Sequence, residues 1–206
     1  MPSRTKRVFF GDFVFVVDEN VYEPAEDSFL FAENLDVKEG ERVLDMGTGC
    51  GILGIIAAKK ASSVVAVDVN PYAVRCAKEN AKLNNVQNKM VFIQGDLFAP
   101  LGEQAKFDVM LFNAPYLPTD VAVGDSWVDR AWAGGATGRQ VIDRFISEAP
   151  RKLKLKGRIF LMQSTLSSVN KTLIKFKGYG LKVRIIADCT LPFFETIALL
   201  NAKYSG

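Results

Sequence analysis

Short apolar runs and longer helix-forming segments alternate through most of this chain, and that order restricts its fold more than any other feature. Each run is rich in Val, Ile, Leu or Phe and has the length of one strand. Strands that alternate with helices predict an α/β protein whose mostly parallel sheet carries helices on both faces. The predicted strands are 42–46, 63–67, 90–94, 107–112 and 157–162, and the predicted helices are 51–60, 71–83, 139–149 and 164–177.

The two ends of the chain depart from this alternation. Residues 8–10 and 13–17 flank a Gly-Asp pair, a pattern typical of a β-hairpin. The strands predicted over 181–187 and 195–200 have no helix between them, so we expect them to pair antiparallel. The expected division is a hairpin extension over 1–20 and a single domain with a seven-stranded sheet over 21–206.

The composition excludes several kinds of chemistry. The 206 residues include no histidine, which excludes Ser-His-Asp catalysis and histidine-ligated metals. Cys50, Cys76 and Cys189 form no CxxC pair, so we expect neither a disulfide framework nor a zinc site, and we expect a reducing, cytoplasmic compartment. No apolar stretch reaches the length of a membrane span.

The small net charge of +3 is unevenly distributed. Residues 149–206 carry eleven Lys or Arg against Asp188 and Glu195, whereas residues 1–148 are acidic overall. Two interpretations of the basic part remain open. It is either an ordinary solvated surface or a docking surface for nucleic acid or for a partner associated with nucleic acid.

A glycine-rich run, Asp-Met-Gly-Thr-Gly-Cys-Gly over 45–51, lies where the strand at 42–46 gives way to a helix. Glycines there allow a ligand to approach the backbone, and the helix start offers unpaired N–H groups. A shifted frame over 49–54 also matches GxGxxG, with Asp68 nineteen residues beyond Gly49, as in a dinucleotide fingerprint. The loop alone therefore does not separate NAD from another nucleoside ligand.

Aspartates end three successive predicted strands, and their charge helps to choose between these ligands. Asp45 would repel a pyrophosphate, but it would attract S-adenosylmethionine, which carries a sulfonium and an ammonium group. Asp68 can accept hydrogen bonds from ribose hydroxyls, and Asp96 from an adenine amino group, while the N–H of Leu97 donates to a ring nitrogen. Each aspartate alone has an alternative as a loop or cap residue. The three together favour S-adenosylmethionine over NAD.

The strand at 107–112 leads into Asn113-Ala114-Pro115-Tyr116, beside the point where open α/β sheets bind ligands. The alternative is a proline-rich exit from a strand. The Asn113 side-chain carbonyl and the Ala114 backbone carbonyl can accept the two N–H bonds of a planar amide, and Tyr116 can pack against it. Methyl transfer depends mainly on positioning, so this chemistry needs no histidine base.

Together these motifs resemble the class I S-adenosylmethionine-dependent methyltransferases, which have a Rossmann-like fold and here would act on a planar nitrogen. The runs VYEPAEDS over 21–28 and WAGGATGR over 132–139 resemble the archaeal–eukaryotic branch of the HemK-type glutamine methyltransferases. The proline and acids of the first run also predict a helix start. The resemblance extends from about Val21 to the last strand and implies methylation of the GGQ-loop glutamine of a class I translation release factor.

The resemblance implies roles for individual positions. Ser28 would contact the cofactor, and Asn113 would bind the glutamine amide. The family usually has proline where this chain has Ala114; the backbone carbonyl survives that change, and Pro115 still favours extended geometry at Ala114. The implied cofactor residues are Ser28, Asp45, Gly47, Gly49, Asp68, Asp96, Leu97 and Asn113, and the implied catalytic residues are Asn113, Ala114, Pro115 and Tyr116.

A partner is also implied. In this fold the strand at 90–94 lies at a sheet edge, and its Met-Val-Phe-Ile-Gln sequence has no charge or proline to block strand addition. The N-terminal hairpin offers one possible cover. The resembled branch instead adds a strand from a small zinc-binding activator there, so we expect a heterodimer.

Other functions remain open beside this one. A nucleic-acid N-methyltransferase would use the same loop together with the basic part, and a methyltransferase-like scaffold would bind the activator without turnover. An NAD-linked oxidoreductase fits less well.

Overall fold

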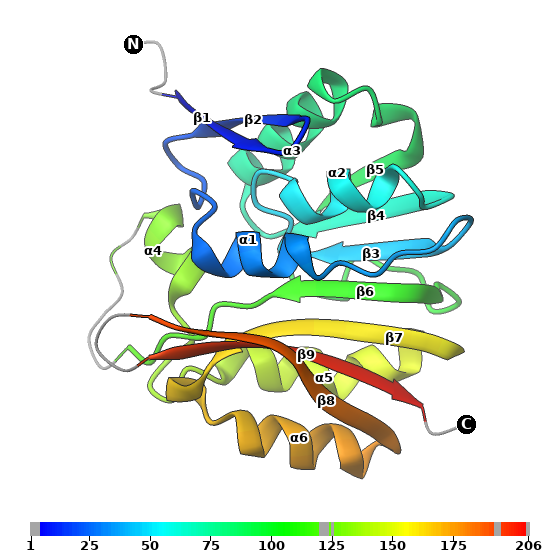
Figure 1. Ribbon diagram of the computed structural model, residues 1–206, viewed down its shortest axis with the longest axis vertical. Helices are drawn as coiled ribbons and strands as arrows, with labels where there is room; N and C mark the ends of the chain where they lie inside the picture. Colours follow the sequence, from blue (N-terminus) through cyan, green and yellow to red (C-terminus); the bar gives the residue numbers. More distant parts are fainter. Residues whose placement is uncertain (1–4, 120–123, 125, 192–194, 205–206) are drawn as a thin grey trace.

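The computed structural model describes residues 5–119, 124, 126–191 and 195–204 (Figure 1). The main sheet contains β3 (Arg42–Met46), β4 (Ser63–Asp68), β5 (Met90–Gln94), β6 (Phe107–Asn113), β7 (Leu153–Ser164), β8 (Leu181–Thr190) and β9 (Thr196–Tyr204). Their order is β5-β4-β3-β6-β7-β9-β8, and only β9 runs antiparallel to its neighbours. The predicted seven-stranded sheet with an antiparallel last strand is confirmed.

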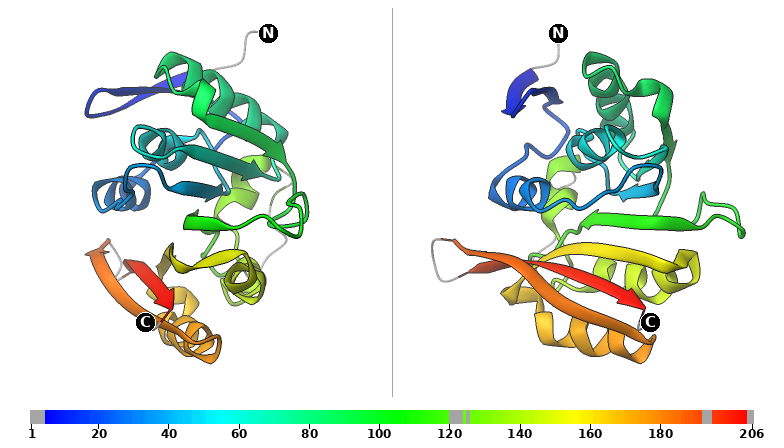
Figure 2. Two further views of the ribbon diagram at one scale, coloured as in Figure 1. Left: turned by 90° about the vertical axis from the view of Figure 1, so that its right-hand side faces the viewer. Right: turned by 45° about the vertical axis from the view of Figure 1, so that its right-hand side comes forward.

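Helices cover both faces of this sheet (Figure 2). The helices are α1 (Glu26–Glu33), α2 (Ile52–Ala58), α3 (Pro71–Leu83), α4 (Trp127–Trp132), α5 (Gln140–Lys152) and α6 (Val169–Gly178), with 3₁₀ turns η1 (Gln87–Lys89) and η2 (Thr165–Ser167). One apolar core lies between the sheet and α1, α2 and α3, and a second lies between the sheet and α5 and α6. No described helix is long and apolar enough to cross a membrane.

The start of α3 follows directly from its sequence. Asn70 precedes the helix, and its Oδ1 accepts a hydrogen bond from the Tyr72 N–H at 2.9 Å, which satisfies one of the free N–H groups of the first turn. Pro71 occupies the first helical position, where its missing N–H costs nothing. The predicted bounds of this helix are confirmed.

The single helix predicted over 164–177 is wrong. Ser168 has a left-handed backbone, with φ of 59°, and separates η2 from α6. The buried guanidinium of Arg139 donates to the carbonyls of Ser167 and Ser168 at 2.7 and 2.9 Å. The Arg139 side chain therefore holds the chain at this break, and α6 begins at Val169, five residues after the predicted start.

The predicted N-terminal hairpin is confirmed as β1 (Thr5–Phe10) and β2 (Phe13–Asp18), a separate two-stranded sheet. Its free edge lies against α3, where side-chain amides take the place of a neighbouring strand. Asn80 exchanges two hydrogen bonds with the backbone of Val16, at 2.8 and 2.9 Å. Asn84 does the same with Val14, at 3.1 and 2.8 Å.

The hairpin lies on α3 and pairs with none of the described strands of the main sheet. Among the described strands, β5 pairs only with β4, so the predicted sheet edge is confirmed. Val91 on this edge is 55% exposed.

Candidate active site

The glycine loop turns sharply between β3 and α2. Gly47, Gly49 and Gly51 all have positive φ, at 63°, 56° and 91°, which side chains rarely adopt. The loop is held from the next strand, because the Gly49 N–H donates to Asp68 Oδ2 at 2.9 Å. The glycines of the predicted motif are therefore needed for the backbone conformation of this turn.

Asp45 lies behind this loop and not in the wall of the cavity in front of it. Its carboxylate is 1% exposed and accepts hydrogen bonds from Thr48 Oγ1 at 2.5 Å and from the Gly54 N–H at 3.0 Å. A Cβ at Gly54 would come within 2.6 Å of that carboxylate, so glycine permits the approach. Burial raises the pKa of Asp45 to about 7, because no cation of the described residues offsets the lost hydration.

Asp68 stands at the end of β4 and faces the cavity. Its second oxygen, Oδ1, accepts from the Asn70 N–H at 2.9 Å. Burial raises its pKa as well, although the hydrogen bonds from backbone N–H groups oppose this shift. A carboxylate of this kind is poised for a ligand that brings hydroxyl or cationic groups.

The cavity at the carboxyl ends of the strands collects most of the predicted cofactor residues. Asp96 lines it but also forms an exposed ion pair with Arg144 at 2.7 Å. Leu97 lines it with a positive φ of 47°. Arg130 is the only cation among its described lining residues, which suits a ligand without phosphate. The predicted residues in the lining are Ser28, Gly47, Gly49, Asp68, Asp96, Leu97 and Asn113, together with Pro115 from the loop over 113–116, which we call the substrate loop.

A second cavity adjoins the first, and Asn113 lines both. Ala114 and Tyr116 line only this second cavity. Asn113 Oδ1 is buried and has no hydrogen-bond partner within the described part of the chain. A buried acceptor without a partner costs about 1–3 kcal/mol, so this atom is available for a donor that enters from a cavity.

Two residues of this region were not predicted as site residues. Asp27, 5% exposed, accepts from Asn113 Nδ2 at 3.0 Å and from the Tyr116 hydroxyl at 3.1 Å. Tyr22 donates to the same carboxylate at 3.2 Å and lines both cavities. The sequence signal is the acid at the start of α1, which belongs to the run 21–28 and fits a helix start equally well.

Both tyrosines are held as donors. Burial, and then the nearby charge of Asp27, raise the pKa of Tyr22 and that of Tyr116 far above the ordinary value. Their hydroxyls therefore stay protonated at neutral pH and donate to the carboxylate.

The segment 132–139 packs against the substrate loop and forms backbone hydrogen bonds with the residue that follows it, Leu117. Leu117 N–H donates to the Trp132 carbonyl at 3.0 Å, and Gly134 N–H donates to the Leu117 carbonyl at 2.8 Å. Gly138 has a φ of 68°, and a Cβ there would overlap the Tyr116 carbonyl. This run therefore fixes the position of the loop that carries Asn113.

Comparison with known proteins agrees with this arrangement. The family model of the methyltransferase small domain matches residues 23–179. A relative from Methanocaldococcus jannaschii, named as a candidate protein N5-glutamine methyltransferase, is 48% identical over 88% of this chain and 91% of its own length. Methyltransferase HEMK2 of Mus musculus is 33% identical over 90% of this chain and 91% of its own.

Among solved structures, the Mtq2–Trm112 complex of E. cuniculi contains a chain that matches with a TM-score of 0.70 and 26% identity. The match covers 90% of this chain and 99% of that one. The fold, the family match and these relatives lead to one conclusion. The chain belongs to the methyltransferase small domain family, as a HemK-type S-adenosylmethionine-dependent methyltransferase.

Proposed function

We propose that this protein methylates the side-chain amide nitrogen of a glutamine, in the GGQ loop of a class I translation release factor, in the cytoplasm. The observation that carries this proposal concerns Asn113, which lines both cavities and whose buried Oδ1 has no partner among the described residues. An acceptor at that place suits a planar nitrogen that still has hydrogens to donate.

The cofactor fits the first cavity. S-adenosylmethionine supplies the methyl group when bound. Asp68 and Asp96 would hold its ribose and adenine, and Ser28, Gly47, Gly49 and Leu97 would complete the lining. Asp45 would act on the methionine part from behind the loop, through its charge and through the backbone that it holds. The scarcity of cations in this lining supports a positively charged ligand.

The chain's own residues then orient the substrate nitrogen. Asn113 Oδ1 and the Ala114 carbonyl would accept the two N–H bonds, while Pro115 and Tyr116 shape the wall around them. The relatives support the choice of acceptor. The M. jannaschii relative is named for N5-glutamine methylation, and the Mtq2–Trm112 complex is described as responsible for methylation of the eRF1 termination factor.

The partner in our proposal is a small zinc-binding activator that adds a strand along β5. The exposed Val91 and the unpaired outer edge of β5 support this site, and the structural relative is itself a complex with Trm112. Val91→Lys should weaken activator binding at least about tenfold, because a charge blocks the edge. Unchanged binding would place the partner elsewhere.

The test of function supplies methyl-labelled S-adenosylmethionine to the purified chain, with and without the activator, in an extract containing release factors and RNA. We expect label that protease destroys, at the size of a release factor, and that maps to the GGQ glutamine. Asn113→Ala is the matched control, with kcat lowered about 100- to 1,000-fold at unchanged cofactor affinity. Label destroyed by nuclease would instead support a nucleic-acid acceptor, and no label would support a scaffold.

A further inference from the structure

The side chain of Asn113 has two ends of similar shape and opposite hydrogen-bonding character. Its Oδ1 end accepts a hydrogen bond, and its Nδ2 end donates two. A substrate N–H can be held only if the oxygen faces the cavity. The enzyme therefore needs something that decides which end points inward.

Asp27 is placed to make that choice. Its Oδ2 lies 3.0 Å from Asn113 Nδ2, and an ionised carboxylate can only accept. The opposite orientation would bring the oxygen of Asn113 against the oxygen of Asp27, with no hydrogen between them. The observed orientation leaves Oδ1 without a partner among the described residues.

Asp27 is itself held on both oxygens. Its Oδ1 accepts from the Ser28 N–H at 2.5 Å, from Ser28 Oγ at 3.0 Å and from the Tyr22 hydroxyl at 3.2 Å. Its Oδ2 accepts from Tyr116 as well as from Asn113. All five donors are uncharged, so the negative charge of Asp27 is not cancelled by a cation in the described structure.

That charge has a second effect. A hydrogen bond from Nδ2 to a carboxylate pushes electron density toward the other end of the amide, because linked hydrogen bonds polarise one another. Oδ1 then becomes a stronger acceptor as the substrate nitrogen gains positive charge during methyl transfer. No histidine is available for such a task in this sequence.

We propose that Asp27 is the positioning residue of this enzyme, which orients and polarises the Asn113 amide so that its oxygen receives the substrate N–H. This proposal rests on one part of the proposed function, namely that the enzyme methylates a nitrogen that carries hydrogens. A nucleobase amino group would need the same orientation.

The structure specifies an informative substitution, Asp27→Asn. The one remaining oxygen at position 27 is required by the Ser28 N–H and the Tyr22 hydroxyl, so the new NH₂ group would face Asn113 Nδ2. Two donors would oppose each other. The Ser28 hydroxyl, whose Oγ lies 3.3 Å from Asn113 Nδ2, can pair with either end of the amide, so Asn113 would rotate and present its NH₂ to the substrate. We expect kcat to fall about 10- to 100-fold, with cofactor affinity unchanged.

The exchange Asp27→Asn with Asn113→Asp tests orientation directly. In that double variant the NH₂ at position 27 donates to a carboxylate at 113, whose other oxygen faces the cavity. We expect kcat to recover at least about tenfold over Asp27→Asn, as for coupled neighbours. Glu26→Gln is the matched control, because Glu26 is the exposed neighbouring acid on α1 and should leave kcat unchanged.

A second readout needs no substrate. In ¹⁵N-labelled protein the side-chain NH₂ signal of Asn113, identified by its loss in Asn113→Ala, should shift in Asp27→Asn and stay in place in Glu26→Gln. The kinetic series is run on whichever acceptor the wild type labels, so a wrong acceptor overturns the proposed function and not this role. Asp27→Asn with kcat within about threefold of wild type, an exchange variant no better than Asp27→Asn, or an unshifted NH₂ signal would each overturn the role of Asp27.

Discussion

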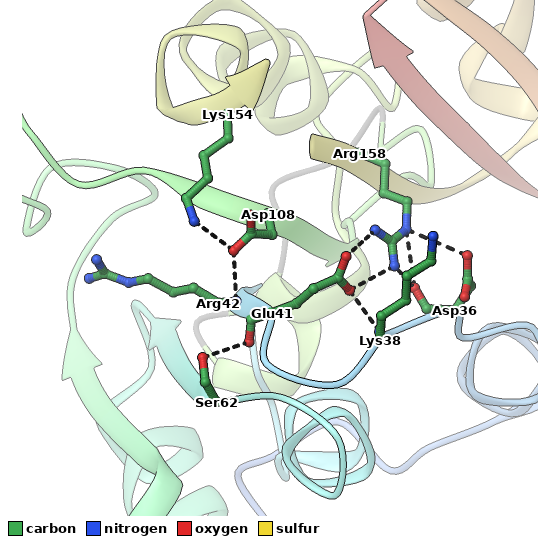
Figure 3. A network of polar contacts seen from close by, with 8 residues as sticks. All are labelled: Asp36, Lys38, Glu41, Arg42, Ser62, Asp108, Lys154 and Arg158. Carbon is green, nitrogen blue, oxygen red and sulfur yellow. Dashed lines mark hydrogen bonds and ion pairs between the residues drawn. The ribbon is translucent and has the colours of Figure 1, made fainter. Parts of the chain in front are cut away.

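The two ends of the parallel strands hold the same kinds of acidic side chain in opposite electrostatic states. At the amino ends, Glu41 accepts from the two terminal nitrogens of Arg158 at 2.7 and 2.9 Å, and Asp108 accepts from Lys154 at 2.8 Å (Figure 3). These bonds outweigh desolvation and lower the pKa of both acids. At the carboxyl ends, burial raises the pKa of Asp45 and of Asp68.

The difference lies in the presence of cations. Arg158 and Lys154 reach the amino-end acids from β7, whereas Asp45 is held by a hydroxyl and a backbone N–H. An acid that already pairs with a cation stabilises the fold, and a ligand gains little by approaching it. A buried acid without a cation lowers the stability of the fold, and a cationic ligand that binds beside it can offset that loss.

The largest expected effect comes from the ligand side of this comparison. Asp68→Ala removes the carboxylate that faces the cavity and holds the Gly49 N–H, so cofactor affinity should fall about 100-fold by calorimetry. Asp108→Ala, at the other end, should leave that affinity unchanged. Equal affinity in wild type and Asp68→Ala would remove Asp68 from the site.

The reverse is expected for the amino end. Arg158→Met removes the cation that pairs with the partly buried Glu41. The free energy of unfolding should therefore fall by about 2 kcal/mol in denaturant titrations, while cofactor affinity stays unchanged. Lys82→Met, which breaks an exposed pair with Glu79, should cost less than about 0.5 kcal/mol. If both variants lost the same small amount, the amino-end network would not be a structural anchor.

A smaller effect concerns pH. The pKa of Asp45 is raised from 3.8 to about 7 in the folded protein. Between about pH 4 and pH 7 the folded state therefore keeps a proton that the unfolded state has lost, and stability falls as pH rises through this window. Asp45→Asn should remove that decline, so the free energy of unfolding of this variant should exceed that of the wild type at neutral pH in the ligand-free protein.

The amino-end acids act with the opposite sign. The lowered pKa of Glu41 and of Asp108 means that their contribution is lost as pH falls through the ordinary carboxyl range. The loss of stability at low pH should thus be the same in wild type and Asp45→Asn. The two curves of unfolding free energy against pH should separate only as the pH approaches neutrality. Parallel curves from pH 4 to pH 8 would contradict the protonated state of Asp45.

Much of this arrangement could be predicted, because it depends on local pattern. The alternation of strands and helices, the Asn70 cap and the position of Asn113 after β6 all follow from short stretches of sequence. The side of the loop on which Asp45 lies depends on how β3 meets α2, and sequence spacing does not specify it. The bond between Asp27 and Asn113 joins residues 86 positions apart, and Arg139 interrupts the predicted helix from outside it.

The amide contacts between the N-terminal hairpin and α3 also constrain the order of synthesis. The backbone of Val14 and Val16 forms hydrogen bonds with the side chains of Asn84 and Asn80. The two valines leave the ribosome well before these asparagines. During translation the hairpin must remain undocked while more than sixty further residues are made. Its free strand edge is exposed throughout that interval, so the nascent chain is most vulnerable to mispairing before α3 has formed.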